Sequence, residues 1–220
     1  MFGLPVYAGR VPNLLLPFLQ RRVRGENTLA VPVCLYGNRN FDDALIELRN
    51  VLSGNGFRPF AAGAFVGEHA FSRVLGAGRP DETDLTDARR LAIIAVERIS
   101  KAVSGKEDGE YLPVAVEGHE PVRPYYMPRD RNGVPINILK VKPKTDPEKC
   151  VRCGLCASIC PMGAIDPADV SSVPGTCIKC CACEKRCPVG AKYFDDLGYL
   201  YHKAELEEMY GHQRAENRIF

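Results

Sequence analysis

The sequence predicts an α/β fold in which a small parallel sheet precedes a compact cysteine-rich domain. As far as about residue 104, apolar segments typical of strands alternate with segments of helical periodicity. That alternation builds a parallel sheet with right-handed crossovers. Beyond residue 149 the composition changes, because nine of the ten cysteines lie there. The 220 residues therefore suffice for two domains of different construction.

The chain opens with the end of a strand and a glycine-bearing loop, which leads to Pro12 at the first position of a helix. A helix is expected over 13–24, and Pro17 should kink or shorten it because proline cannot donate a backbone hydrogen bond. Residues 28–36 form a continuous apolar run typical of a strand buried on both faces. Pro32 suits only the start of a strand, so we expect the paired part at 33–36.

Two further helices and a strand complete this half. A helix is expected over 41–52, capped by Asn40 and ended by Gly54. Residues 57–66 form another apolar strand. A long helix is expected from Asp84 to just before Gly105, and its buried stripe should comprise Leu85, Ala88, Ala92, Ala95 and Ile99. Ligands of such sheets bind where loops leave the carboxyl ends of the strands.

The cysteine-rich half contains one pattern twice, CVRCGLCASICP from residue 150 and CIKCCACEKRCP from residue 177. Each copy has Cys, two residues, Cys, two residues, Cys, three residues, Cys and Pro, which is the spacing of bacterial iron–sulfur ligands. Three closely spaced thiolates on a tightly curled backbone can reach three corners of one iron–sulfur cube, and the fourth corner needs a more distant cysteine. A pair of structural zinc sites is the alternative, although zinc usually takes four ligands in two CxxC-like pairs.

This stretch of about 40 residues resembles the bacterial dicluster ferredoxins, in which the fourth cysteine of each run ligates the other cluster. The resemblance extends to Pro-Met-Gly-Ala at 161–164 and Pro-Val-Gly-Ala at 188–191. It implies two 4Fe–4S clusters, one held by Cys150, Cys153, Cys156 and Cys187, and the other by Cys177, Cys180, Cys183 and Cys160. Cys181 takes the place of Gly154 in the other copy, and we expect it not to be a ligand.

Residues 3–84 carry a second resemblance, through the segments PVYAGRVP, LYGNRNFDDAL, GAFVGEHAF and GRPDETD. In this order they are similar to the later part of the flavodoxin-like domain that is fused to a dicluster ferredoxin in the bacterial EFR1 family. The resemblance implies a partial flavodoxin-like parallel sheet, with strands equivalent to the third, fourth and fifth of a flavodoxin. It also implies contacts to an FMN ring from Tyr7, Ala8, Gly9, Arg10, Tyr36, Gly37, Asn38 and Arg39.

The sequence departs from that family at the phosphate site. The first strand of a flavodoxin is followed by a Ser/Thr- and Gly-rich loop around the FMN phosphate, and no such stretch occurs here. The chain begins about where the third strand would, so we expect FMN to bind weakly or not at all. A strand that is central in the flavodoxin order would then form an unpaired edge. Such an edge is expected to pair with a second copy, giving a homodimer.

The composition indicates which partners and which cellular compartment to expect. The formal net charge of +2 predicts no nucleic-acid surface. No apolar run approaches the ~18 residues of a membrane span, and no leader-like segment precedes Gly3. We therefore expect an intracellular, cytoplasmic protein. Thiolate ligands and oxygen-sensitive clusters favour the reducing cytoplasm of an anaerobe.

These observations predict four parts: a partial flavodoxin-like domain at 1–106, a Pro- and Gly-rich strap at 107–147, an α+β ferredoxin-like domain at 148–195, and a C-terminal helix (204–214) and tail within 196–220. We expect an electron carrier whose two clusters exchange single electrons with a redox partner protein and couple to flavin chemistry. Two alternatives stay open. One is a flavin-dependent reductase of a small substrate, for which no acid–base pair is evident. The other is a flavin-free ferredoxin whose α/β part docks a partner.

Overall fold

The computed structural model describes residues 1–103 and 112–220, which form two compact units. The first unit contains Met1–His69, Arg73–Tyr126 and Tyr210–Phe220, and the second contains Ala70–Ser72 and Met127–Met209. The predicted helix end before Gly105 and the predicted start of the strap at residue 107 lie outside the described residues. In the described part of the chain, no helix is both long and apolar enough to cross a membrane.

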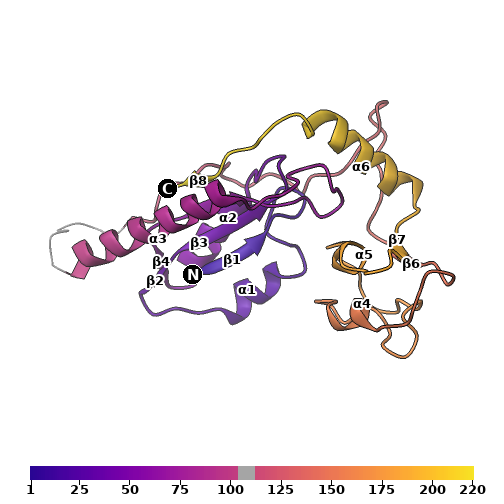
Figure 1. Ribbon diagram of the computed structural model, residues 1–220. Helices are drawn as coiled ribbons and strands as arrows, with labels where there is room; N and C mark the ends of the chain where they lie inside the picture. The colour runs from indigo at the N-terminus through magenta and orange to yellow at the C-terminus, as the bar shows by residue number, and fades with distance from the viewer. Residues whose placement is uncertain (104–111) are drawn as a thin grey trace. The chain divides into compact units, whose positions relative to one another are not determined.

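Parallel strands form the centre of the first unit (Figure 1). Among the described residues its strands are β1 (Phe2–Pro5), β2 (Thr28–Ala30), β3 (Pro32–Tyr36), β4 (Phe57–Pro59), β5 (Gly63–Val66) and β8 (Arg218–Ile219). β1, β3 and β5 are hydrogen-bonded in that order and run parallel, and β2 and β4 form a second parallel pair. The predicted mixed α/β class with a parallel sheet is therefore confirmed. β8, which was not predicted from the sequence, joins β5 antiparallel.

Each of the two long apolar runs, at 28–36 and 57–66, forms two separate strands. Pro32 is the first residue of β3, where its missing N–H removes no internal bond of the strand. The preceding segment at 28–30 was expected outside the ladder, but it pairs with β4. The run at 57–66 is divided in the same way, so that each run contributes to both sheets.

The helices of the first unit are α1 (Leu16–Arg22), α2 (Ala44–Gly54) and α3 (Glu82–Val103). The prediction that Pro12 begins a helix is wrong, because its carbonyl closes a turn with the amides of residues 15 and 16, and Pro17 lies in the first turn of α1 instead. The predicted cap at Asn40 is also wrong. Its side-chain oxygen accepts from the Asp42 amide at 2.7 Å, which forms a local turn, and α2 begins only at Ala44.

The predicted buried stripe of α3 is wrong in its orientation. Of the five residues expected there, Ala95 is buried and the other four are exposed. Leu91 is buried with Ala95 instead, in a core cluster that includes Phe65 of β5. Asp84, at the start of the helix, forms a buried ion pair with Arg79. This pair fixes the rotation of α3, which helical periodicity alone could not decide.

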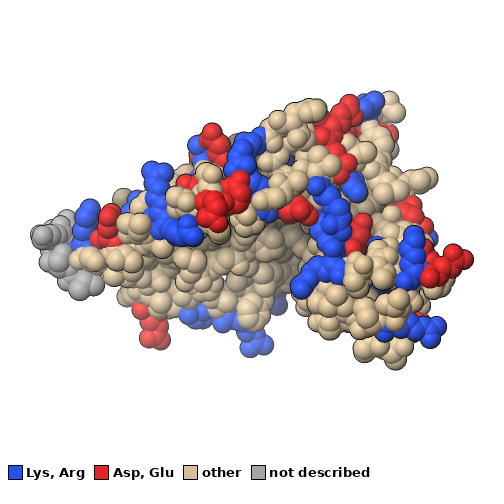
Figure 2. Space-filling view, viewed as in Figure 1, with Lys and Arg blue, Asp and Glu red and all other residues tan. Residues whose placement is uncertain are grey.

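The elements of the second unit are β6 (Lys144–Thr145), α4 (Leu155–Ser158), α5 (Ala182–Lys185), β7 (Lys192–Tyr193) and α6 (Leu197–Tyr210). β6 and β7 pair antiparallel. The predicted C-terminal helix at 204–214 is wrong in its bounds, since Asp196 accepts from the Tyr199 amide at 2.9 Å and starts α6 earlier. On the visible face of each unit, basic and acidic side chains are interspersed (Figure 2).

Candidate metal centres

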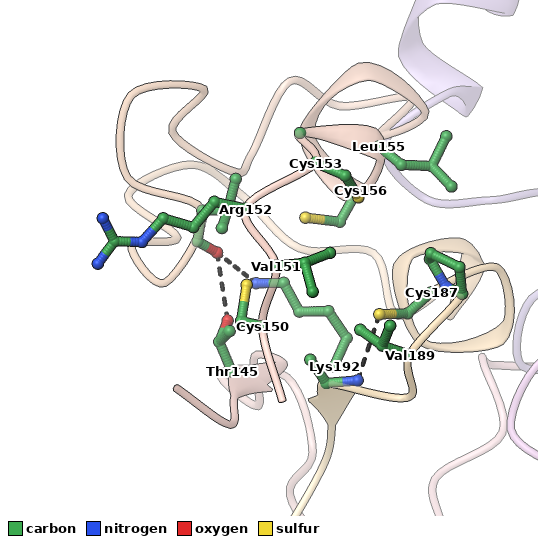
Figure 3. Close-up of a pocket in the computed structure, with 14 residues that line it drawn as sticks. Thr145, Cys150, Val151, Arg152, Cys153, Leu155, Cys156, Cys187, Val189 and Lys192 are labelled. Atoms are coloured by element: carbon green, nitrogen blue, oxygen red, sulfur yellow. Dashed lines mark hydrogen bonds between the residues drawn. The ribbon is translucent and has the colours of Figure 1, made fainter. Parts of the chain in front are cut away.

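Four cysteines from both copies of the motif line a hollow of about 330 Å³, a volume that includes space open to solvent: Cys150, Cys153, Cys156 and Cys187. Figure 3 shows the sulfur atoms of Cys150, Cys156 and Cys187 turned toward a shared space. The first three cysteines come from the first copy, and the fourth comes from the second copy.

The complementary set lines a second hollow of about 380 Å³, again including open space: Cys160, Cys177, Cys180 and Cys183. Here three cysteines come from the second copy and one from the first. The structure thus brings together the members of each expected ligand set. Cys181, expected to be a non-ligand, also lines this hollow. Its Sγ lies 3.4 Å from the Tyr199 hydroxyl oxygen.

Left-handed turns at matching positions shape the two sites. The φ angles of Arg152, Gly154 and Gly163 are 54°, 74° and 56°, and those of their counterparts Lys179, Cys181 and Gly190 are 56°, 56° and 62°. Such turns curl the backbone, so that cysteines two or three residues apart can face the same space. α4 and α5 each begin directly after one of these turns, at Gly154 and Cys181.

Backbone amides point at sulfur atoms in both sites. The Ala164 amide donates to Cys160 Sγ at 3.3 Å, and the Ala191 amide donates to Cys187 Sγ at 3.2 Å. Bonds of this kind favour the charged thiolate. Burial raises the pKa of Cys187, but the amides of residues 189–192 together bring that pKa below its ordinary value. These amides therefore favour the thiolate form of Cys187, which is the form that binds a metal.

Burial dominates at other thiols in the second hollow. It raises the pKa of Cys183 to about 12 and that of Cys181 to about 12, and it also raises the pKa of Cys180. A buried thiolate at these positions needs a nearby positive charge, and a coordinated metal centre supplies one. The donor set and its surroundings therefore fit a metal–thiolate group.

The repeated cysteine spacing is typical of an iron–sulfur cluster and differs from the two CxxC-like pairs of a zinc site. Within the described residues, no group of three or more His, Cys, Asp or Glu side chains is placed to hold one metal ion. A zinc ion needs each sulfur about 2.3 Å from one point. Thiolates at the corners of an iron–sulfur cube stand farther apart than those around one zinc ion.

Sequence reasoning missed Lys192, which also lines the first hollow. Its side chain is only 3% exposed, and its Nζ donates to the Val170 carbonyl at 2.5 Å. Lysine is normally read from sequence as a solvent-exposed charge. A direct comparison of the two copies, PMGAI and PVGAK, was the available signal, since it places Lys192 opposite Ile165.

The loops after β1 and β3 contain the residues expected to contact a flavin ring. Because these strands are parallel neighbours, the loops leave the same edge of the sheet. Several of their groups are bound by the chain itself. Arg10 donates to the Glu47 carboxylate and to the Arg123 carbonyl. The Ala8 carbonyl accepts from the Tyr126 amide at 2.8 Å.

The C-terminal segment at 210–220 binds the loop after β3. The Tyr36 hydroxyl donates to the Glu216 carbonyl at 2.5 Å. The side chain of Asn38, only 2% exposed, donates to the carbonyls of residues 210 and 213 and accepts from the Ala215 amide. In this arrangement the polar groups of Arg10, Tyr36 and Asn38 named above are bonded within the first unit.

Comparison with models of known protein families matches residues 143–166 to the 4Fe–4S binding domain. The matched segment contains all four cysteines of the first copy. A search of curated proteins and a search of solved structures each gave no significant match. The match supports an iron–sulfur protein of ferredoxin type with a role in electron transfer.

Proposed function

We propose that the second unit binds two 4Fe–4S clusters and exchanges single electrons with a redox partner protein. One observation carries this proposal: each hollow is lined by four cysteines, three from one copy of the motif and one from the other. The family match supports an iron–sulfur centre at the first copy. The second copy repeats the spacing and the backbone turns of the first.

In this proposal, Cys150, Cys153, Cys156 and Cys187 hold the first cluster, and Cys177, Cys180, Cys183 and Cys160 hold the second. When bound, a 4Fe–4S cluster supplies a one-electron couple whose potential depends on local charge, hydrogen bonds and exposure. The chain contributes amide donors to the thiolates. Buried Ile165 and Val170 exclude water from the core beside Cys183.

The crossed ligand sets would also hold the two copies together. Each centre takes its fourth thiolate from the other copy, so loading either centre ties 150–160 to 177–187. Between Cys150 and Cys187, where every residue is described, the regular secondary structure consists of the single turns α4 and α5. We infer that the clusters stabilise this unit, as bound metals stabilise other small domains.

For the first unit we propose a partial flavodoxin-like domain, as in the EFR1 family, which docks the partner without a resident flavin. The order β1-β3-β5 supports the fold, and the bonds from 210–220 to Tyr36 and Asn38 support the lack of a flavin. A flavin-coupled carrier is the second candidate, favoured by the placement of both loops at one sheet edge. Flavin content of the purified protein separates the two.

We also propose that the protein works in a reducing cytoplasm and that β1 forms the contact of a homodimer. Among the described strands, β1 pairs only with β3, so its other side is an edge. Pro5 lies in this strand and offers no N–H. The dimer contact would therefore have fewer hydrogen bonds than an edge without proline.

The experiment for the cluster proposal is metal and sulfide analysis of protein purified without oxygen. We expect about eight iron and about eight acid-labile sulfide per chain. Cys34→Ala is the matched control, because Cys34 is a buried cysteine of β3 in the first unit and should not affect iron content. Stoichiometric zinc, or about four iron per chain, would contradict the proposal.

A further inference from the structure

At one of the positions where the two copies of the motif differ, a buried wall residue is charged in one hollow and apolar in the other. After the Gly-Ala pair, the first copy has Ile165 and the second has Lys192. Ile165 is 4% exposed and lines the second hollow, whereas Lys192 is 3% exposed and lines the first. A buried lysine is uncommon because removing its charge from water is costly. We therefore expect a counter-charge for Lys192 within the first hollow.

The side chain of Lys192 runs from β7 through the first hollow to the Val170 carbonyl (Figure 3). A carbonyl accepts the hydrogen bond but does not neutralise the charge. Among the described residues, no carboxylate lies within ion-pair distance of Lys192. The charged groups that interact with it at longer range are Asp169, which also interacts with Arg152, and the thiolate form of Cys183.

We propose that Lys192 raises the reduction potential of the first cluster above that of the second, so that a single electron in this unit resides mainly at the first site. The inference rests on the proposed function, since it needs both clusters. Reduction adds one negative charge to a cluster, and a buried cation beside it favours that charge. Lys192 lines the first hollow, and the apolar Ile165 takes its place in the second.

Exposure of the two sites acts in the same direction. Cys153 in the first hollow is exposed, whereas Cys183 and Phe194 in the second are buried. Water near a cluster stabilises added charge, and an apolar wall does not. The charge of Lys192 also reaches Cys183, so it raises both potentials. We expect its effect on the second potential to be the smaller one, because Lys192 lines the first hollow and not the second.

The test is a potentiometric titration of the full chain, monitored by electron paramagnetic resonance without oxygen. Lys192→Met removes the charge and keeps an unbranched side chain, Lys192→Arg keeps the charge, and Ile165→Met is the matched control. The signal of the first cluster is assigned by its absence in Cys153→Ala. In Lys192→Met we expect the preference of the electron for the first site to fall at least tenfold, which is about 59 mV for one electron. Lys192→Arg should retain most of that preference, and Ile165→Met should change it little.

Iron analysis separates the inference from the function on which it depends. If the unaltered chain lacks about eight iron, the proposed function fails. If Lys192→Met keeps full iron and both potentials are unchanged, or both shift equally, the role of Lys192 is overturned. Should Lys192→Met lose iron, Lys192→Gln is titrated in its place. Loss of iron in both variants would show that Lys192 holds the site together, which also overturns the inference.

Discussion

Asp84→Asn should destabilise the first unit by about 3–5 kcal/mol, because it leaves a buried arginine without its counter-charge. The side chains of Arg79 and Asp84 are 5% and 2% exposed, and two guanidinium nitrogens donate to the two carboxylate oxygens. Asp84 also accepts from the Asp81 amide and from the Asn217 side chain, each at 2.8 Å. The pair thus joins α3 to the loop before it and to the C-terminal segment.

The size of the effect follows from what asparagine retains. Its amide keeps the shape and one acceptor oxygen, but its NH2 group faces the donors of Arg79. Hydrogen bonds to charged groups contribute about 1.5–3 kcal/mol each, and the unpaired buried charge adds its own cost. Arg214→Gln is the matched control, since Arg214 pairs with Asp81 on the surface and is 56% exposed. Its loss should cost less than about 1 kcal/mol.

Hydrogen exchange at increasing urea, read by mass spectrometry, measures the two variants unit by unit. A single global transition is not suitable, because a chain of two units need not unfold in one step. Peptides from α3 and β8 should lose protection in Asp84→Asn and keep it in the control. If Asp84→Asn costs no more than Arg214→Gln, the pair does not hold α3 in place.

The same pair gives the first unit a dependence on acid. Hydrogen bonds from Arg79 hold the pKa of Asp84 well below its usual range, although burial opposes them. Asp84 therefore makes its full contribution to the free energy of unfolding above the pKa of an unfolded aspartate, about 3.9. That contribution is lost as the pH falls below this value. Hydrogen bonds from Arg123 lower the pKa of Asp43 in the same way. The difference in free energy of unfolding between the unaltered protein and Asp84→Asn should shrink on acidification. This difference separates the contribution of Asp84 from that of Asp43.

Removal of Cys187 or Cys160 by alanine should in each case leave about four iron per chain, and full iron in either variant would contradict the crossed ligand sets. Cys181→Gly should keep all the iron, because glycine suits the φ of 56° at this position; iron loss on analysis would identify Cys181 as a ligand. Added FMN should give no stoichiometric bound-flavin spectrum. Tight binding would show that FMN displaces residues 210–220 from Tyr36 and Asn38. Sedimentation should show a dimer that Gly3→Lys weakens by placing charge on the β1 edge, and a monomer throughout would refute that contact.

Local signals were sufficient for the elements that depend on neighbouring residues. Pro32 marks a strand start because of its own backbone chemistry, and α2 ends at Gly54, where the sequence predicted its end. The rotation of α3 could not be predicted in this way. Two faces of that helix carry apolar residues at helical spacing, and the choice between them depends on the ion pair of Arg79 with Asp84. β8 was missed because a strand of two residues has no periodicity.

The candidate centres show the same division. The cysteine pattern was visible because a repeated spacing of one rare residue is a strong local signal. The ferredoxin resemblance implied the two crossed ligand sets, and the fold brings Cys187 to the first hollow and Cys160 to the second. Lys192 gave no signal of its own, since burial of a lysine is a property of the tertiary structure. The contacts of 210–220 with Asn38 likewise join distant parts of the chain.

The return of the chain to the first unit has a consequence for synthesis. The backbone leaves that unit after Tyr126 and re-enters it at Tyr210, and Phe220 then exchanges hydrogen bonds with Ala62 at 3.0 and 3.2 Å. The cluster-binding segment is therefore an insertion with both ends anchored. On the ribosome, domains generally fold in the order in which they emerge. Here the N-terminal sheet stays incomplete until residues 210–220 have left the exit tunnel, so the inserted unit can acquire its metal before its host has finished folding.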